Sequence, residues 1–394
     1  MKRLGFVLTL GALAAVSATA IDICIPALPE IGRTLGASPE AGAALVTGYL
    51  LGYGPGQLLW GPLSDRYGRL GPLYITVVGF VFTSIACALA GSLDFLVAMR
   101  FLQGLMGGGA PAIARAIARD QGGGPETARL ISTMTVLIGG APLVAPVIGS
   151  ALLVVTGWRW IFGFLVVFGI LLIVGVFLFL GRRRRRKRRD ATTVAAYARS
   201  ALPLFAAPEF LLGIGIGSSI FAGYATVLAA SAVIAQERYG IAPQSFGPIF
   251  SIAALAFMMG STTARQALRR VSLPRLLLAG AAVAACAGIG LGTAAHAALS
   301  LVPLWILICL YTFAFGLLAP VATAMALEPA GGIAGLASSI VGTVQILVGA
   351  ASSKLVVAGL FGDSYTSLCV IIAASAAVTF ALALLGQRLR RPAS

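Results

Sequence analysis

The sequence has very little charge. Only 10% of its 394 residues are Asp, Glu, Lys or Arg, whereas hydrophobic residues make up 59% and the mean hydropathy is +0.99. Water-soluble domains carry about 25% charged residues, so this chain lacks the side chains needed to cover a water-facing surface. We therefore expect lipid to be its solvent.

Residues that bind metals or catalyse reactions are also scarce. The one histidine, His296, lies in a predicted loop, and the five cysteines lie in apolar runs without ligand-like spacing, so we expect no metal site. No Gly-x4-Gly-Lys-Ser/Thr motif for ATP hydrolysis occurs. A membrane-embedded transferase would need a buried histidine, paired acids or a metal. We predict a chain that is not an enzyme and has no cofactor.

The formal net charge of +16 does not indicate a nucleic-acid partner. Basic residues form one run at 182–189, and most of the others lie in short gaps between apolar stretches. No segment is long enough to fold into a soluble basic domain that binds nucleic acid. The run is compatible with binding to anionic membrane lipids, but a topology anchor between two halves is the simpler interpretation.

Apolar stretches long enough to cross about 30 Å of hydrocarbon recur along the chain. They lie near residues 4–29, 40–60, 72–91, 94–118, 127–155, 158–181, 208–235, 244–264, 273–294, 299–327, 331–360 and 364–386. This pattern predicts an all-α polytopic membrane protein with about twelve transmembrane helices in two six-helix bundles. The predicted parts are an N-terminal bundle (1–181), an Arg-rich linker (182–205) and a C-terminal bundle (206–394).

The first stretch has a second interpretation. Lys2 and Arg3, an apolar run and a small-residue sequence at 18–20 resemble a signal peptide with its cleavage site. The apolar run, however, continues through Ile25 without a polar break, so we predict a membrane span. The basic residues fall almost entirely on the side of the N-terminus, and only Arg33, Arg159 and Arg238 lie in the opposite loops. This bias predicts that both termini are cytoplasmic.

Two ionisable residues lie deep inside predicted spans, where such groups are costly and usually functional. Asp22 lies seven residues before the outer end of the first span, and Arg100 lies six residues after the outer start of the fourth. At 1.5 Å per residue both lie on the order of 10 Å below the outer rim, so a buried pair is possible. A carboxylate beside a guanidinium stays ionised, whereas one without that partner takes up a proton more readily. We expect Asp22 and Arg100 to couple transport to protons; a static salt bridge is the alternative.

The loop between the second and third spans reads Gly61-Pro62-Leu63-Ser64-Asp65-Arg66-Tyr67-Gly68-Arg69. This sequence resembles the signature loop of the major facilitator superfamily. The tail of the loop departs from the family pattern, because Leu70 replaces a basic residue and the proline is displaced to Pro72. The resemblance implies a conformational latch formed by Gly61, Asp65, Arg66, Gly68 and Arg69, with Arg115 or Arg119 as the partner of Asp65.

Further motifs are residues 100–104 (RFLQG), 145–150 (APVIGS), 21–29 (IDICIPALP), 56–60 (GQLLW) and 157–162 (GWRWIF). The first two resemble motifs of the drug–proton antiporters, and the last three resemble the bicyclomycin/chloramphenicol (Bcr/CflA) exporters among them. In the second motif, Ala145 and Ser150 replace two glycines of the family motif. Pro146 and Gly149 are implied to let this helix kink and pack closely.

The resemblance implies proton-driven export of small amphiphilic antibiotics across the inner membrane, by a protein that we expect to be monomeric. A natural metabolite, such as an amino acid, a siderophore or an endogenous antibiotic, is an equally compatible cargo. In this interpretation helices 1, 4, 7 and 10 line a central cavity. Its candidate residues are Tyr53, Gln103, Phe221, Tyr224, Phe313 and Gln345, although packing or hydrogen bonding between helices explains each of them as well.

Overall fold

The computed structural model describes residues 2–121, 125–181, 201–297 and 299–389. The chain divides into two compact units, Met1–Val194 with Ala242–Pro248, and Ala195–Ile241 with Ile249–Ser394. Most of the predicted linker, residues 182–200, lies outside the described residues. The described part contains only helices, turns and loops, with no strand.

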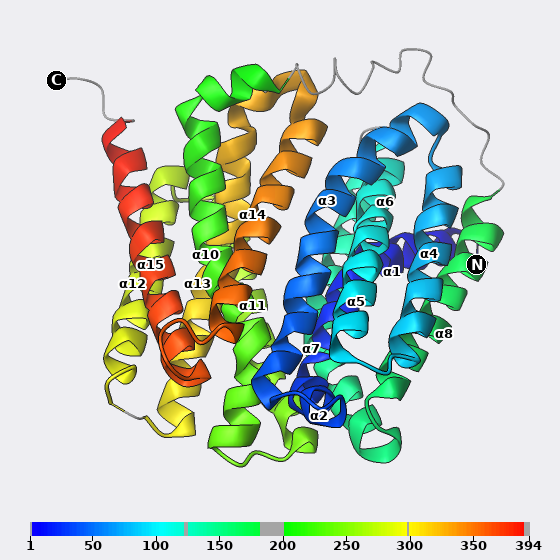
Figure 1. Cartoon of the computed structure of the whole chain (residues 1–394). Coiled ribbons are helices and arrows are strands. Elements are labelled where there is room, and N and C mark those ends of the chain that lie inside the picture. Colours follow the sequence, from blue (N-terminus) through cyan, green and yellow to red (C-terminus); the bar gives the residue numbers. More distant parts are fainter. Residues whose placement is uncertain (1, 122–124, 182–200, 298, 390–394) are drawn as a thin grey trace. The chain divides into compact units, whose positions relative to one another are not determined.

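The helices of the first unit run from blue through cyan to green in Figure 1, and two of its predicted spans are interrupted. Their bounds are α1 (Lys2–Asp22), η1 (Ile25–Ala27), α2 (Leu28–Thr34), η2 (Pro39–Ala43), α3 (Ala44–Tyr67), α4 (Leu70–Ala88), α5 (Leu93–Gly107), α6 (Gly109–Arg119), α7 (Pro125–Thr156), α8 (Arg159–Gly175) and η3 (Val176–Leu180). Within this unit α3 packs along α5, and α1 packs along α7.

The second unit is built mainly around α10. Its elements are η4 (Leu202–Ala206), α10 (Pro208–Val233), η5 (Ile234–Arg238), α11 (Pro243–Ala267), α12 (Leu273–Ala294), α13 (Leu301–Leu327), η6 (Glu328–Ile333), α14 (Ala334–Val357) and α15 (Ser364–Leu389). The start of α11 groups with the first unit and the rest with the second. Helix α10 packs against α13, α14 and α15, so nearly its whole length is buried.

The first predicted span is broken after Asp22, which the sequence interpretation did not foresee. Pro26 has no N–H to donate to the carbonyl four residues back, and Pro29 repeats the loss one turn later. The backbone tightens at this point, because the Cys24 N–H bonds to the Ile21 carbonyl, three residues back, at 3.2 Å. The chain then continues as η1 and α2 to Thr34 instead of ending near Pro29.

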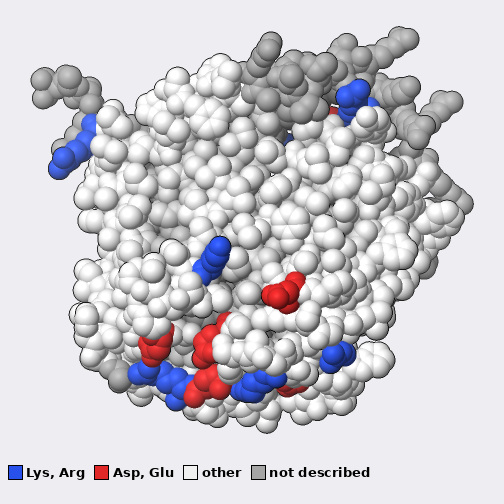
Figure 2. Space-filling model, in the orientation of Figure 1, with Lys and Arg blue, Asp and Glu red and all other residues white. Residues whose placement is uncertain are grey.

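Ten helices of the described chain are long and apolar enough to cross a membrane. The two further predicted spans are α3, which is rich in glycine, and the α5–α6 pair, which is divided at Gly108. Together these segments give the predicted twelve helices. Large apolar side chains in the spans are openly exposed, for example Phe177 at 69% and Ile289 at 69%. Figure 2 shows a largely uncharged surface, with most visible charges along its lower edge. Such a surface suits lipid.

Glycines allow the closest helix contacts in the first unit. A Cβ atom at Gly52 or Gly56 of α3 would collide with the α5 backbone carbonyls of Phe101 and Leu105, and one at Gly104 would collide with the carbonyl of Tyr49. Small residues therefore let the helix backbones touch, and this close packing favours helix association in lipid, where burial of apolar side chains does not. The same glycines lower the hydropathy of α3.

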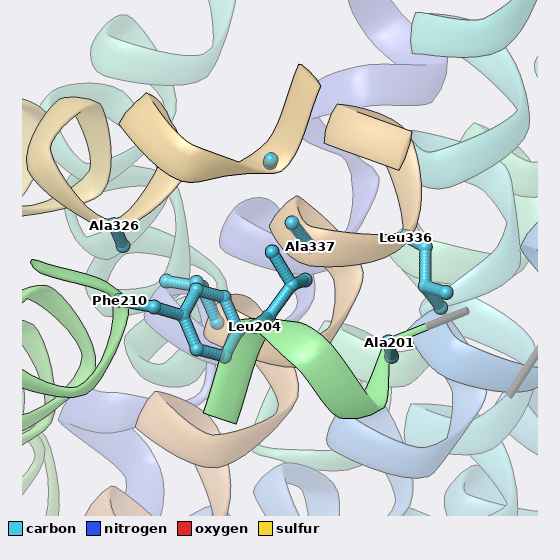
Figure 3. Packing of buried hydrophobic residues seen from close by; sticks show 8 residues of the cluster. Ala201, Leu204, Phe210, Ala326, Leu336 and Ala337 are labelled. Carbon is cyan, nitrogen blue, oxygen red and sulfur yellow. The ribbon is translucent and has the colours of Figure 1, made fainter. Parts of the chain in front are cut away.

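A hydrophobic cluster holds the start of the second unit together (Figure 3). Leu204 of η4 and Phe210 of α10 pack against Ala326, Leu336 and Ala337 near the facing ends of α13 and α14. These side chains are at least 95% buried. The cluster thus holds η4, the first described element of the second unit, against the ends of α13 and α14.

Candidate functional site

The fully buried guanidinium of Arg100 joins helices α1, α3 and α5. Its Nη1 donates to the Ala20 carbonyl at 3.2 Å and to Gln103 Oε1 at 2.6 Å, and its Nε donates to the Leu45 carbonyl at 3.5 Å. The guanidinium also lies over the Tyr49 ring, 4.4 Å from its centroid. Carbonyls and an aromatic face offset part of the desolvation of this charge.

Gln103 positions Arg100 and does not line a cavity. Its side chain is fully buried. The amide oxygen accepts from Arg100, and Nε2 donates to Ser84 Oγ of α4 at 2.7 Å. Of the two roles that the sequence left open for Gln103, the structure shows interhelical hydrogen bonding.

Asp22 lies at the same level of the unit as Arg100, since Arg100 bonds to Ala20 two residues earlier. The side chain of Asp22 is 3% exposed. Yet within the part of the chain that the structure describes, its carboxylate forms neither a hydrogen bond nor an ion pair with Arg100 or with any other residue. The salt bridge considered for the sequence is therefore not formed: Nε and Nη1 of Arg100 bind other acceptors, and Nη2 has no hydrogen-bond partner in the described structure.

Helix α7 passes beside Asp22 at the motif of Pro146 and Gly149. A Cβ atom at Gly149 would collide with the carbonyl of Ile23, the residue that follows Asp22. Pro146 is buried within α7 and interrupts its hydrogen-bond ladder one turn earlier. These residues let α7 close against the break in the first span, so the motif and the acid belong to one site.

The loop between α3 and α4 is organised by Arg69. Gly68 ends α3 with φ = +88°, a conformation that residues with a Cβ rarely adopt. The chain thereby turns back, and Arg69 Nη1 contacts Asp65 Oδ1 at 2.5 Å and donates to Ser64 Oγ at 2.8 Å. The Ser64 hydroxyl in turn donates to the Gly61 carbonyl at 2.8 Å.

Arg69 also reaches the end of α6. Its Nε donates to Asp120 Oδ2 at 2.8 Å, and its Nη2 donates to Asp120 Oδ1 at 3.4 Å, in a forked arrangement. Burial works against its charged form, but the hydrogen bond from Arg69 to Asp120 and the charge of Asp65 raise the pKa of Arg69 above its usual value. The loop is thus tied to the end of α6 through the carboxylate of Asp120, the residue that follows this helix.

This partner differs from the expected one. Arg115 and Arg119 of α6 are exposed, and neither forms an ion pair with Asp65 in the described structure. Arg66 is also exposed and lies over the ring of its neighbour Tyr67, at 5.4 Å from the centroid. The positive charge at the centre of the loop network therefore belongs to Arg69.

Comparison with known proteins identifies the family. The model of the Major Facilitator Superfamily matches residues 10–353. This chain belongs to the major facilitator superfamily. It is 31% identical to the MFS-type transporter YdgK of Bacillus subtilis over 363 residues, which cover 90% of this chain and 89% of the relative. It is therefore a multi-pass membrane transporter, as predicted.

Two further relatives carry functional names. The chain is 27% identical to a bicyclomycin resistance protein homolog of Haemophilus influenzae, over 89% of this chain and 88% of the relative. It is 28% identical to multidrug resistance protein D of Escherichia coli, over 87% and 86%. The relatives agree with the subgroup that the motifs indicated.

The superfamily fold is confirmed by solved structures. A crystal structure of a D-xylose-proton symporter superposes with a TM-score of 0.73 at 20% identity, covering 96% of each chain. At this identity the likeness concerns the fold alone. The prediction of an all-α major facilitator fold is thus correct.

The second unit of this superfamily member carries an aromatic cluster. Tyr224 stacks on Phe315, with centroids 4.7 Å apart and an interplanar angle of 21°. Phe221 lies 5.8 Å from Phe315, and Phe257 of α11 lies 5.2 Å from it. Phe313, named as a cavity candidate, has no ring contact with this cluster in the described structure, because it lies on another face of α13.

Two cavity candidates remain to be placed. Tyr53 of α3 is partly exposed, and its ring centroid lies 6.1 Å from that of Tyr49. Gln345 of α14 places its Nε2 against Gly217 of α10, and this nitrogen has no hydrogen-bond partner in the described structure.

The sequence analysis assigned no role to four residues of these networks, namely Ser64, Ser84, Asp120 and Phe257. Ser64 lies within the signature loop, and Asp120 also had a signal in the sequence. It is an acid directly after the predicted fourth span, on the same side as the signature loop.

Proposed function

We propose that the chain is a proton-coupled antiporter that exports small amphiphilic antibiotics across the inner membrane by alternating access. Phenicols and bicyclomycin-like compounds are the first candidates. The names of the bicyclomycin-resistance and multidrug-resistance relatives support the class of cargo. The energy source is the proton gradient, no cofactor takes part, and the transporter acts as a monomer with both termini in the cytoplasm.

One observation carries the proposal: a buried carboxyl group without a counter-charge in the described structure lies at the level of a fixed buried guanidinium. Arg100 is held by two backbone carbonyls and by Gln103. Asp22 lies at its level with no partner in the described residues. A carboxyl group in that setting is accommodated most cheaply when neutral, whereas a small approach to the guanidinium favours the anion. A rearrangement of α1 against α5 would load or release one proton at Asp22.

The break in the first span supports such a rearrangement. Asp22 is the last residue of α1, and the helical hydrogen-bond ladder is interrupted after it by the tightened turn and by two prolines that lack N–H donors. Gly149 keeps α7 in backbone contact with Ile23 at the same place. Movement of this segment would change the environment of Asp22 without displacing Arg100. The Arg69 network would hold one conformation at the end of the unit.

The test uses the full chain in proteoliposomes with an imposed pH gradient and radiolabelled chloramphenicol or bicyclomycin. We expect Asp22→Asn to lose transport driven by the gradient but to retain exchange of labelled for unlabelled drug, because exchange needs no net proton. Asp94→Asn, which changes an exposed acid of α5 in the same unit, is the control and should transport normally. Gradient-driven transport by Asp22→Asn would disprove the coupling role.

The cargo is tested separately in a strain that lacks its main efflux pumps. Expression of the chain should raise the inhibitory concentration of at least one phenicol or bicyclomycin, and Asp22→Asn should abolish the increase. If no inhibitory concentration changes although the protein reaches the membrane, the cargo is a natural metabolite. The orientation is checked by attaching a cytoplasm-active reporter to the C-terminus.

A further inference from the structure

Beyond its first two turns, helix α10 is buried except at one place. From Ile216 to Ala235 every residue is buried apart from two, Phe221 and Tyr224, which remain partly exposed. These two residues are three positions apart, so their rings lie on the same face of the helix. A stretch of helix that is otherwise enclosed thus leaves two adjacent aromatic rings accessible.

The rings around this opening already stack in the manner that aromatic ligands use. Tyr224 lies nearly parallel to Phe315, and Phe257 adds a third ring whose centroid is 6.5 Å from Tyr224 at 23°. Phe315 is 9% exposed, whereas Phe257 is partly exposed. Parallel, offset rings at these separations are favourable beyond the area that they bury. The cluster therefore offers a prepared face for one more planar ring.

Unsatisfied polar groups lie one helical turn away from these rings. Ser218 Oγ and Gln345 Nε2 are buried and have no hydrogen-bond partner in the described structure. Ser218 precedes Phe221 by three residues, about 4.5 Å along the helix axis. Gln345 lies against Gly217, and the Phe221 ring covers Gly349, one turn farther along α14.

Leaving two buried donors unsatisfied is costly, and the cost is removed when an acceptor arrives. Such groups are exceptions in folded proteins and call for a reason. An apolar side chain of similar size at position 218 or 345 could fill the same space without burying an unpaired hydrogen-bond donor. A ligand that supplies an acceptor gives both residues a role.

We infer that the second unit contains a half-site for a planar aromatic compound, whose ring stacks beside Tyr224 and whose acceptor group receives hydrogen bonds from Ser218 and Gln345. The acceptor, for example a carbonyl or nitro oxygen, lies about one helical turn from the ring centre. The inference rests on the proposed export function for its biological meaning, but it concerns binding alone. It predicts a preference for aromatic over non-aromatic antibiotics.

The test measures binding to the purified full chain in nanodiscs by isothermal titration calorimetry. The probes are chloramphenicol and norfloxacin, which are aromatic and carry acceptors, and bicyclomycin, which has no aromatic ring. We expect Tyr224→Leu to weaken binding of both aromatic probes about threefold to tenfold, the loss of one stacking partner. Tyr224→Phe should bind within about twofold of the wild type, and bicyclomycin should be unaffected by either change.

The acceptor site has its own variants. Ser218→Ala and Gln345→Met should each weaken the aromatic probes by about threefold to tenfold, the loss of one hydrogen bond to a neutral group. The control is Phe164→Leu, which removes one ring of the stacked Phe164–Phe168 pair of α8 in the first unit. It should leave all three affinities unchanged. Each variant is first checked for a single peak by size exclusion.

The outcomes separate the half-site from the export function. The half-site is overturned if neither aromatic probe binds up to about 1 mM, or if Tyr224→Leu and Phe164→Leu have the same effect. Gradient-driven export of bicyclomycin with no dependence on Tyr224 would then leave the export function standing. Conversely, Tyr224-dependent binding of the aromatic probes without any pH-driven transport would support the half-site and refute the proton-coupled function.

Discussion

Replacing Arg69 by alanine tests whether the loop between α3 and α4 is held by one arginine. The change removes the contact with Asp65, the hydrogen bond to Ser64 and the fork on Asp120. The carboxylates are 41% and 52% exposed, so each ion pair contributes only about 0.5 kcal/mol after solvent screening. The bond to the buried Ser64 adds about 1 kcal/mol. The sum is about 2 kcal/mol.

The assay is thermal unfolding of the purified protein in detergent, followed by the fluorescence of a thiol-reactive dye. For a cooperative unit of this size, about 2 kcal/mol lowers the melting temperature by about 4–8 °C. Arg66→Ala is the matched control, because Arg66 lies in the same loop but contacts only the neighbouring Tyr67 ring. We expect a change of less than about 1 °C for this variant.

A double-mutant cycle separates the parts of the network. If the Arg69–Asp120 fork is a direct interaction, the effects of Arg69→Ala and Asp120→Ala should be less than additive. Equal melting temperatures for Arg69→Ala and Arg66→Ala would refute the assignment of Arg69 as the centre of the loop. Full additivity of the two alanine variants would refute the fork.

Three further predictions concern other sites. Gly149→Val should abolish transport, because its side chain collides with the Ile23 carbonyl, whereas Gly140→Val, which meets no neighbouring atom, should transport normally in the proteoliposome assay. Gln103→Leu should lower transport at least tenfold with little change in expression, because Arg100 loses its side-chain acceptor; unchanged transport would refute the positioning role. The pKa of Asp363 lies below its usual value, chiefly because the Thr366 side chain hydrogen-bonds to it, with a further contribution from the Thr366 N–H. The ionised carboxylate therefore stabilises the fold above the pKa of the unfolded chain, about 4, and this stabilisation is lost as the pH falls through the lower folded value. The melting temperatures of wild type and Asp363→Asn should therefore differ at pH 7 and converge as the pH falls below the folded pKa, and a constant difference would contradict this reasoning.

The arrangement of spans could be predicted from the sequence because it depends on length and hydropathy. The limits of most helices follow from turns and prolines that are visible in the sequence, such as Pro243 at the start of α11. Helix α3 and the α5–α6 pair are less evident, because their glycines replace apolar side chains in return for backbone contact. That exchange depends on the partner helix, which a sequence does not specify.

The residues of the site could be named, but their partners could not. Asp65 was assigned to an arginine of α6 because opposite charges shared one side of the membrane. The structure shows Arg69, four residues away on the chain, in contact with Asp65 and also with Asp120. The choice depends on the turn at Gly68, whose positive φ brings Arg69 back over the end of α3. The direction of the Arg69 side chain thus depends on the φ angle of Gly68, which the sequence analysis did not consider.

The separation of Asp22 from Arg100 has a similar local origin. In a regular helix the Cys24 N–H would bond to the Ala20 carbonyl, four residues back. Here it bonds to Ile21 instead, ahead of Pro26, and the freed Ala20 carbonyl accepts from Arg100. The break in the helix therefore supplies an acceptor that competes with the nearby carboxylate. Because neutral acceptors bind Nη1 and Nε of Arg100, these two nitrogens keep their partners whether or not Asp22 carries a proton, and Nη2 has none in the described structure. Matching depth in the sequence located both residues, but the backbone between them determines that they function as neighbours and not as a salt bridge.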